Sequence, residues 1–361
     1  MIKADCNDTI AAVATPIGEA GIGIVRISGK DALAIADKLF VSRNKQKPSQ
    51  AKTHTMHYGW IIDAASAGKE IIDEVILTVM RSPRSYTKED IVEINCHGGI
   101  IALRSTLDVV LASGARLAEP GEFTQRAFLN GRIDLAQAEA VLDIIRAKTD
   151  SALKISLAQL KGALSKQISS IRRVILDVLS ALEANIDFPD EEISPANLNG
   201  LAQHLKNTEQ KLQGILQASG YGRILREGVN VVICGRPNVG KSSLLNSILR
   251  QERAIVTPVA GTTRDTIEEI INIKGIPIKI VDTAGIIEPR DLVEKKAVLR
   301  AKEYMRLADL VILVFDGSKK LTTDDRMLIK RLNKKTVLAL VNKIDLKQKI
   351  EKDKIVEIFD R

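Results

Sequence analysis

The chain of 361 residues carries a formal net charge of +8, with 45% hydrophobic and 3% aromatic residues. That length predicts two or three domains, and the composition excludes a disordered or fibrous chain. No run approaches the ~18 apolar residues of a membrane span, and no signal segment is visible. Cys6, Cys96 and Cys234 are too widely spaced for a disulfide framework. We therefore expect a cytoplasmic protein without a membrane partner.

The positive charge is concentrated in one part of the chain. Residues 221–361 carry a net +9, whereas residues 1–220 carry −1. With so few aromatic residues, a stacking platform for single-stranded nucleic acid is not expected. The charge is therefore a weak sign of general nucleic-acid binding.

The first part of the chain has the pattern of a compact α+β domain. Residues 9–27 contain two β-like apolar runs around a Gly/Pro loop, and residues 71–80 and 91–95 predict two more strands. Residues 43–52 are polar and predict a loop. We place this domain at residues 1–120.

A helical region follows, which we place at residues 121–220. Apolar residues recur every three or four positions from Leu153 to Ile186, which predicts one long helix with a single apolar face that ends before Pro189. Residues 198–216 predict a second helix, closed by Ser219-Gly220. Core packing in a helical bundle is the simpler interpretation of the apolar face, and a dimerising coiled coil is the alternative.

From Gly228 the pattern changes to alternating strands and helices. The runs 229–234, 277–281, 311–315 and 337–341 are short and almost continuously apolar. Such runs are typical of strands buried on both faces of a mostly parallel sheet. We therefore predict a multidomain α/β protein whose third domain spans residues 221–361.

The segment Gly235 to Ser242 matches the phosphate-binding pattern GxxxxGK[ST], between a predicted strand and a predicted helix that starts near Ser243. Backbone N–H groups of such a loop bind phosphates. Lys241 is expected to reach the β- and γ-phosphates, and the Ser242 hydroxyl is expected to bind Mg²⁺.

Two later motifs follow strands of the same sheet. In Asp-Thr-Ala-Gly at 282–285, Asp282 is placed to orient the Mg²⁺ shell and the Gly285 amide to bind a γ-phosphate. In Asn-Lys-Ile-Asp at 342–345, the Asp345 carboxylate matches the two N–H donors of guanine, a pair that adenine lacks. The three motifs in this order predict a GTP site and resemble the translation-factor-like GTPases.

The loop between the first two motifs predicts a nucleotide-dependent switch. Thr263 in its Ala-Gly-Thr-Thr-Arg-Asp segment is our candidate for a second Mg²⁺ ligand that senses the γ-phosphate. The position at which Ras-like proteins carry a water-orienting Gln is Ile286. The nearby acids Glu288 and Glu294 are the candidates for that role.

Several longer segments make the chain resemble the MnmE (TrmE) family of bacterial tRNA-modification GTPases over essentially its whole length. They are DTIAAVATPIGEAGIGIVRISG at 8–29, SYTKEDIVEINCHGG at 85–99, AEPGEFTQRAFLNGRIDLAQAEA at 118–140, IDFPDEE at 186–192, and GRPNVGKSSLLN followed by IVTPVAGTTRD.

The resemblance implies an N-terminal domain that dimerises and binds a one-carbon tetrahydrofolate (5-formyl- or 5,10-methylene-tetrahydrofolate), a helical domain, and a GTPase (G) domain inserted into the helical domain. It implies GTP hydrolysis that depends on K⁺ and gates the reaction through G-domain dimerisation. It also implies a homodimer that forms a heterotetramer with MnmG, which uses FAD and NADH, and that modifies C5 of the wobble uridine of certain tRNAs.

The resemblance also implies site residues. Arg26, Glu93 and Arg132 match the family's folate positions, where arginines suit the ligand's glutamate tail and a carboxylate suits its pterin ring; interface salt bridges are the alternative. The acid that matches the family's catalytic glutamate is Glu294. K⁺ is implied at Asn238, Thr257, Val259 and Thr262. The full set of expected nucleotide contacts is Asn238, Val239, Gly240, Lys241, Ser242, Ser243, Thr257, Pro258, Val259, Ala260, Gly261, Thr262, Thr263, Asp282, Thr283, Ala284, Gly285, Asn342, Lys343 and Asp345.

His97 and Cys96 invite a nucleophilic role, but a turn into a helix near Ile100 is the simpler expectation. Only 16 residues follow Asp345, and the family's remaining strand, helices and Cys-x-Gly-Lys end are not among them, so we expect a fragment or an interrupted product with an incomplete G domain. Two alternatives remain open, an Era- or Der-like ribosome-assembly switch and an inactive truncated product.

Overall fold

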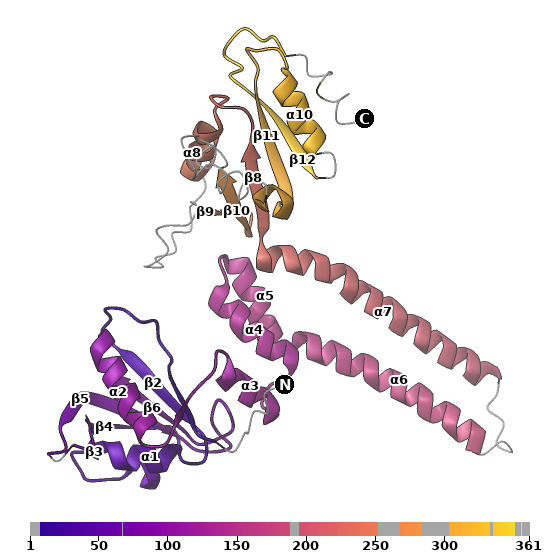
Figure 1. Ribbon diagram of the computed structural model, residues 1–361. Coiled ribbons are helices and arrows are strands. Elements are labelled where there is room, and N and C mark those ends of the chain that lie inside the picture. The colour runs from indigo at the N-terminus through magenta and orange to yellow at the C-terminus, as the bar shows by residue number, and fades with distance from the viewer. Residues whose placement is uncertain are drawn as a thin grey trace. The chain divides into compact units, whose positions relative to one another are not determined.

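The computed structural model describes residues 8–66, 68–187, 195–251, 268–282, 303–332, 335–350 and 355. The chain divides into two compact units, Met1–Val141 and Leu142–Arg361. Figure 1 shows a sheet with its helices near the N-terminus, two long helices in the middle of the chain and a second sheet toward the C-terminus.

The first unit is built on a seven-stranded sheet in the order β3-β4-β5-β6-β2-β1-β7. All neighbouring strands are antiparallel except β1 and β7. The bounds are β1 Ile10–Val13, β2 Gly23–Ser28, β3 Phe40–Ser42, β4 Thr55–Ile62, β5 Ile71–Met80, β6 Ile91–Cys96 and β7 Arg116–Leu117.

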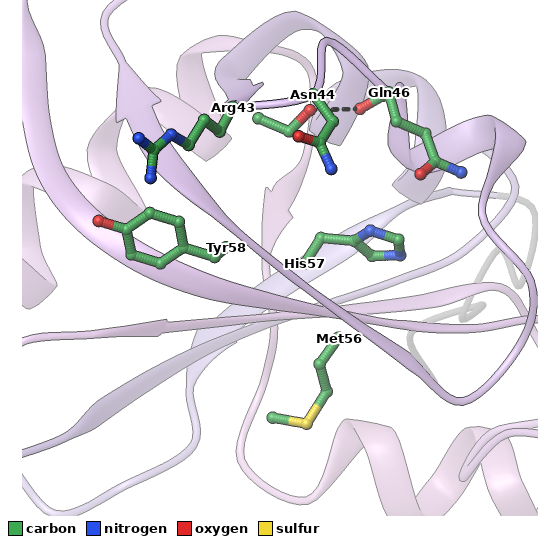
Figure 2. Close-up of a pocket in the computed structure, with 7 residues that line it drawn as sticks. Arg43, Asn44, Gln46, Met56, His57 and Tyr58 are labelled. Atoms are coloured by element: carbon green, nitrogen blue, oxygen red, sulfur yellow. Dashed lines mark hydrogen bonds between the residues drawn. The ribbon is translucent and has the colours of Figure 1, made fainter.

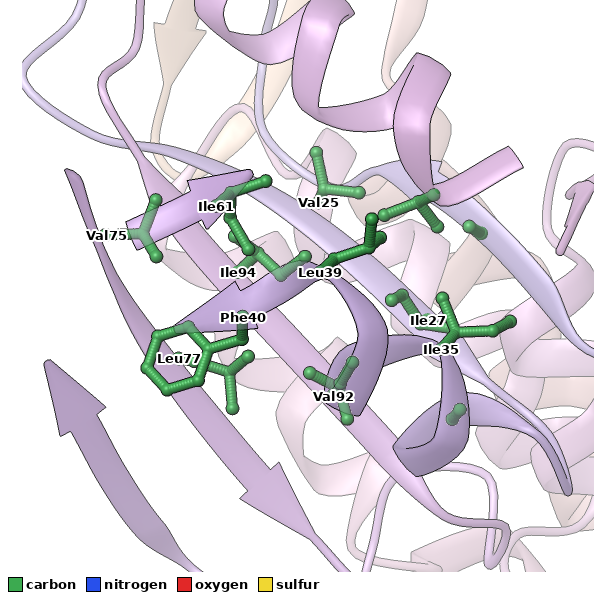
Figure 3. Packing of buried hydrophobic residues seen from close by; sticks show 14 of the residues in the cluster. Val25, Ile27, Ile35, Leu39, Phe40, Ile61, Val75, Leu77, Val92 and Ile94 are labelled. Atoms are coloured by element: carbon green, nitrogen blue, oxygen red, sulfur yellow. The ribbon is translucent and has the colours of Figure 1, made fainter. Parts of the chain in front are cut away.

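Helices α1 (Ala32–Leu39) and α2 (Ile100–Ala112) bury apolar residues in the core of this unit. Ile35 and Leu39 of α1 pack in the same cluster as Val25 and Ile94 of the sheet (Figure 3). The remaining helices that begin in the unit are a 3₁₀ turn at Pro48–Gln50, α3 Glu122–Leu129 and α4 Leu135–Arg146, which continues past the unit's boundary. The predicted α+β character is confirmed, and the predicted loop at 43–52 contains the 3₁₀ turn.

The helical region differs from the single long helix predicted from residue 153 to residue 186. The chain forms α5 (Asp150–Leu160) and α6 (Ala163–Asp187), separated at Gly162, whose φ of +80° favours glycine. The second helix, α7 (Pro195–Glu227), passes through Ser219-Gly220 instead of ending there. Residues 188–194, with the predicted stop at Pro189, lie outside the described residues.

The residues of the predicted apolar face are less buried than core packing in a helical bundle requires. Of its members on α6, Ile171 is buried, whereas Leu179 and Leu182 are exposed. Helices α6 and α7 pack against each other, and one neighbouring helix covers only part of such a face. Core packing therefore accounts for a minority of the periodic residues.

The second sheet has the order β12-β11-β8-β10-β9. Strands β12, β11, β8 and β10 are parallel to one another, and the edge strand β9 is antiparallel to β10. Buried clusters include residues of this sheet, Phe315 with Ile329 in one and Ile233 with Leu245 in the other. The bounds are β8 Val229–Cys234, α8 Lys241–Gln251, β9 Glu268–Ile273, β10 Ile276–Asp282, β11 Leu310–Asp316, α10 Thr323–Arg331 and β12 Val337–Asn342.

The mostly parallel sheet is therefore confirmed, with the four predicted strands in place. The antiparallel edge strand β9 was not predicted. No helix in the described part of the chain is long and apolar enough to cross a membrane.

Candidate functional site

The GxxxxGKS segment forms a strand–loop–helix turn between β8 and α8. The loop has positive φ at Gly235 (+149°), Asn238 (+62°) and Gly240 (+100°). A Cβ on Gly235 would meet the backbone carbonyl of Val314, and one on Gly240 would meet the amide of Asn342. Both glycines are therefore required by the backbone conformation and by close neighbours.

Lys241, the first residue of α8, is buried within this turn. Its ammonium group donates to the carbonyl oxygens of Gly235 (3.0 Å) and Arg236 (2.8 Å). The loop itself thus positions the cation beside the backbone N–H groups of the helix start, where phosphate oxygens are attracted.

The Asn342-Lys343 pair follows β12 and contacts the same loop. The Asn342 amide donates to the Val239 carbonyl oxygen (2.9 Å), and the Lys343 ammonium group donates to the Asn238 carbonyl oxygen (2.8 Å). Asp345 is exposed. The structure therefore brings Asn342 to Val239 and Lys343 to Asn238, although the partners are 103 and 105 positions apart in sequence.

Asp316 is a member of this site that the sequence analysis missed. It ends β11, is buried, and accepts from the Lys343 ammonium group at 2.8 Å and from the Ser318 hydroxyl at 2.6 Å. These donors hold the pKa of the Asp316 carboxyl well below its usual range. Its position directly after an apolar strand was the available signal.

A second missed contact joins the loop to α10. The Arg236 guanidinium donates through Nε to Asp325 Oδ1 (3.0 Å). Asp325 also closes a capping box at the start of α10, where its other oxygen accepts from the Thr322 N–H (2.9 Å). The buried Asp325 carboxylate therefore caps the start of α10 and also binds Arg236 of the phosphate loop.

Other residues that the sequence predicted for the nucleotide contacts, or for orienting the attacking water, lie outside the described residues. This applies to Thr257, Pro258, Val259, Ala260, Gly261, Thr262, Thr263, Thr283, Ala284, Gly285, Glu288 and Glu294. Asp282 is described through its backbone, which pairs with Ile233 of β8 and so lies at the same end of the sheet as the phosphate loop.

The three residues matched to folate positions lie together in the first unit. Arg26 and Glu93 are paired across β2 and β6, with guanidinium–carboxylate distances of 2.6 and 2.7 Å. The Arg132 guanidinium carbon lies 4.8 Å from the centre of the Tyr86 ring, and that of Arg26 lies 5.7 Å from the same ring. Phe123 is the second ring beside Arg26, at 5.6 Å. Sequence reasoning missed Tyr86 and Phe123, although both fall in the segments quoted for the family resemblance.

Cys96 and His97 precede the turn into α2, which begins at Ile100 as predicted. Burial raises the pKa of the Cys96 thiol, which disfavours the reactive thiolate. The exposed His97 imidazole contacts Asp73 (Nδ1–Oδ1 2.7 Å), and the hydrogen bond to this carboxylate raises the histidine pKa. Burial also raises the pKa of Cys234 to about 12.

A separate pocket of about 230 Å³ lies at strands β3 and β4 of the first unit (Figure 2). It contains none of the residues predicted from the sequence, and its lining residues are Ser42, Arg43, Asn44, Gln46, Met56, His57 and Tyr58. Within the described residues, no group of three His, Cys, Asp or Glu side chains forms a metal site.

The chain is similar to two family models and to several known proteins. Residues 9–132 match the family model described as the GTP-binding protein TrmE N-terminus, and residues 135–359 match the MnmE helical domain. The tRNA modification GTPase MnmE of Alkaliphilus oremlandii is 51% identical over 353 residues, which are 98% of this chain and 76% of the relative.

The protein of the same name from Carboxydothermus hydrogenoformans is 51% identical over 342 residues, or 95% of this chain and 74% of the relative. Among solved structures, Aquifex aeolicus Era bound to GDP and AlF₄⁻ is 31% identical, with a TM-score of 0.28; the match covers 37% of this chain and 45% of that one.

Proposed function

Because this chain belongs to the MnmE (TrmE) family of tRNA modification GTPases, we propose that it hydrolyses GTP to gate the addition of an aminomethyl or carboxymethylaminomethyl group to C5 of the wobble uridine in certain tRNAs. The observation that carries the proposal is the contact between the Asn342 amide and the Val239 carbonyl oxygen, which unites the phosphate loop with the guanine-reading motif.

In the proposed GTP site, Lys241 binds the β- and γ-phosphates and Asp345 binds the guanine edge. Ser242 is an exposed residue in the first turn of α8, next to Lys241, so its hydroxyl suits a Mg²⁺ ion that arrives with the phosphates. Thr263 is the proposed second ligand of that ion, and Asp282 orients its water shell. Mg²⁺ supplies charge neutralisation on the phosphates.

We assign the stimulation of hydrolysis to K⁺ and to Glu294. Asn238 is an exposed residue of the phosphate loop, and its side-chain oxygen suits a hard monovalent cation. Thr257, Val259 and Thr262 complete the proposed ligand set, and Glu294 orients the attacking water. A cation at this position stabilises the charge that develops on the transferred phosphoryl group.

The proposed folate site consists of Arg26, Glu93 and Arg132. Two guanidinium groups, one carboxylate and two aromatic rings within one cluster suit a ligand that combines a hydrogen-bonding ring with carboxylates. A 5-formyl- or 5,10-methylene-tetrahydrofolate meets that description. When bound, the folate supplies the one-carbon unit.

We place the folate-binding domain at residues 1–120, the helical domain at 121–220 and the G domain at 221–361. The proposed assembly is a cytoplasmic homodimer that joins MnmG, which uses FAD and NADH, and acts on tRNA. G-domain dimerisation is the proposed link between GTP hydrolysis and modification.

The GTPase part of the proposal is tested by the turnover of GTP in matched KCl and NaCl buffers. We expect turnover to be higher in KCl by on the order of tenfold or more, and Asn238→Ala to remove the difference. Lys241→Ala should abolish turnover, whereas Lys320→Ala, an exposed lysine of the same domain, should not change it. Equal turnover in the two salts contradicts the K⁺ assignment, and a Lys241→Ala variant with full activity contradicts the GTP site.

A further inference from the structure

Tyr86 stands between the two arginines of the proposed folate site. Its half-buried ring lies 4.8 Å from the Arg132 guanidinium carbon and 5.7 Å from that of Arg26. Its hydroxyl is hydrogen-bonded to the Thr124 hydroxyl of α3 at 2.9 Å. The ring is therefore fixed at one end by α3 and presents its π-system to two cations.

The two arginines differ in charge compensation. Arg26 forms a close ion pair with Glu93, and both side chains are mostly buried, at 27% and 17% exposure. Arg132 is exposed, and within the described part of the chain no carboxylate forms an ion pair with it. The Arg26–Glu93 pair is neutral as a unit, whereas Arg132 keeps a positive charge for an anion.

We infer that different residues of the site bind different parts of the ligand. Arg132 receives the carboxylate end of the ligand, Tyr86 is the positioning residue that holds the Arg132 guanidinium, and the Arg26–Glu93 pair contacts the uncharged ring. The pair offers an acceptor next to donors, which matches the N–H groups and carbonyl oxygen of a pterin. This inference rests on the proposed folate site and assigns its parts.

The π-face of Tyr86, and not its hydroxyl, acts on Arg132. Tyr86→Phe keeps the ring and loses the hydrogen bond to Thr124, so it should retain carboxylate recognition. Tyr86→Leu removes the ring and should weaken binding of a carboxylate ligand roughly two- to fivefold. Arg132→Gln removes the cation and should weaken it on the order of tenfold to a hundredfold.

The experiment compares two probes by calorimetry with the full chain. One is 5-formyl-tetrahydrofolate, and the other is its diamide, in which both tail carboxylates are neutral amides. The ratio of their dissociation constants measures carboxylate recognition alone. A general loss of folding changes both affinities, whereas loss of positioning changes the ratio. Tyr58→Leu, an exposed tyrosine on β4 outside this cluster, is the matched control.

We expect the wild type to bind 5-formyl-tetrahydrofolate more tightly than its diamide. Tyr86→Phe and Tyr58→Leu should keep this preference. Tyr86→Leu and Arg132→Gln should reduce it. In the double variant Tyr86→Leu/Arg132→Gln, the preference should equal that of Arg132→Gln alone, because the ring acts through Arg132. If the ratio of dissociation constants is unchanged in Tyr86→Leu, the ring does not position Arg132. If the ratio is unchanged in Arg132→Gln, Arg132 does not bind the carboxylate end of the ligand.

If Tyr86→Leu does not fold, Tyr86→Met tests the ring in its place, and Arg132→Gln at an exposed position still tests whether Arg132 binds the carboxylate end. A wild type that binds neither probe refutes the folate site itself, an outcome distinct from a wild type that binds both with equal affinity.

Discussion

Arg126 Nη2 lies 3.0 Å from Glu122 Oε1 one turn away on α3, and both side chains are almost fully buried. Arg126 also pairs with Asp8 and with Glu89 (3.3 Å), and Glu89 accepts from the Ser28 hydroxyl (2.6 Å). This network fixes α3, the helix that carries Phe123 and Thr124 beside the proposed folate site. Its integrity therefore determines the position of Tyr86 as well.

Arg126→Met is expected to destabilise the protein by about 3–5 kcal/mol, because it removes the Glu89 ion pair and leaves Asp8 and the buried Glu122 to share Arg116. The free energy of unfolding is measured by urea denaturation. Arg104→Met is the matched control, since Arg104 forms an exposed pair with Asp108 at 3.6 Å on α2. That variant should change stability by less than about 1 kcal/mol, and equal effects in the two variants would contradict the role of the network.

The His97–Asp73 contact predicts a titration with a defined sign. Because the Asp73 carboxylate stabilises the imidazolium, the His97 pKa lies above the ordinary histidine value of 6.5. Its contribution to stability is therefore complete below that value and is lost as the pH rises through the folded-state pKa. NMR titration should show a high midpoint in the wild type and a lower one in Asp73→Asn. An unshifted His97 midpoint in Asp73→Asn would refute the contact.

Asp345 predicts base specificity. Its carboxylate is proposed to accept two hydrogen bonds from guanine, so Asp345→Asn should weaken GTP binding on the order of tenfold to a hundredfold. Xanthine presents a carbonyl oxygen in place of the guanine amino group, and the new amide can donate to it. The variant should therefore bind the xanthosine triphosphate more tightly than the wild type does. Unchanged affinity for both nucleotides would place the base elsewhere.

Asp325 predicts a local stability effect at the start of α10. Asp325→Asn removes the charge that Arg236 and the Thr322 N–H share, and we expect a loss of about 1–2 kcal/mol. Asp324→Asn alters the neighbouring exposed acid of the same helical turn and should cost less than about 0.5 kcal/mol. Thermal unfolding of the two variants checks this difference, and a larger loss in Asp324→Asn would reverse the assignment.

The strands around the phosphate loop were predictable because continuous apolar runs such as 311–315 mark strands buried on both faces. The edge strand β9 carries Glu268 and Glu269 and pairs on one side only, so its pattern is weaker. The break at Gly162 was hidden because the three- and four-residue spacing of apolar positions continues across it. The spacing of apolar residues shows which face of a helix they share, but it does not show where one helix ends and the next begins in another direction.

The site was predictable where a short motif carries the chemistry, as in the 235–242 loop. Tyr86 and Phe123 belong to no such motif, since their roles come from the approach of a loop and of α3 to Arg26. Asp316 likewise becomes part of the site only because β12 places Lys343 beside β11. Contacts of this kind depend on tertiary structure, and local sequence does not encode them in a recognisable pattern.

In the proposed function, GTP hydrolysis by this chain gates the transfer of a folate-borne carbon to tRNA. The most direct measurement is incorporation of an isotopically labelled methylene carbon from tetrahydrofolate into the wobble uridine, with MnmG, tRNA, GTP, NADH, FAD, K⁺ and ammonium or glycine as the nitrogen donor present. We predict GTP-dependent labelling that is lost in Lys241→Ala. At a folate concentration near the wild-type dissociation constant, labelling should be reduced in Arg132→Gln, which should still hydrolyse GTP. If the wild-type protein hydrolyses GTP at the full rate but no label enters the tRNA, the proposed link between hydrolysis and modification is wrong.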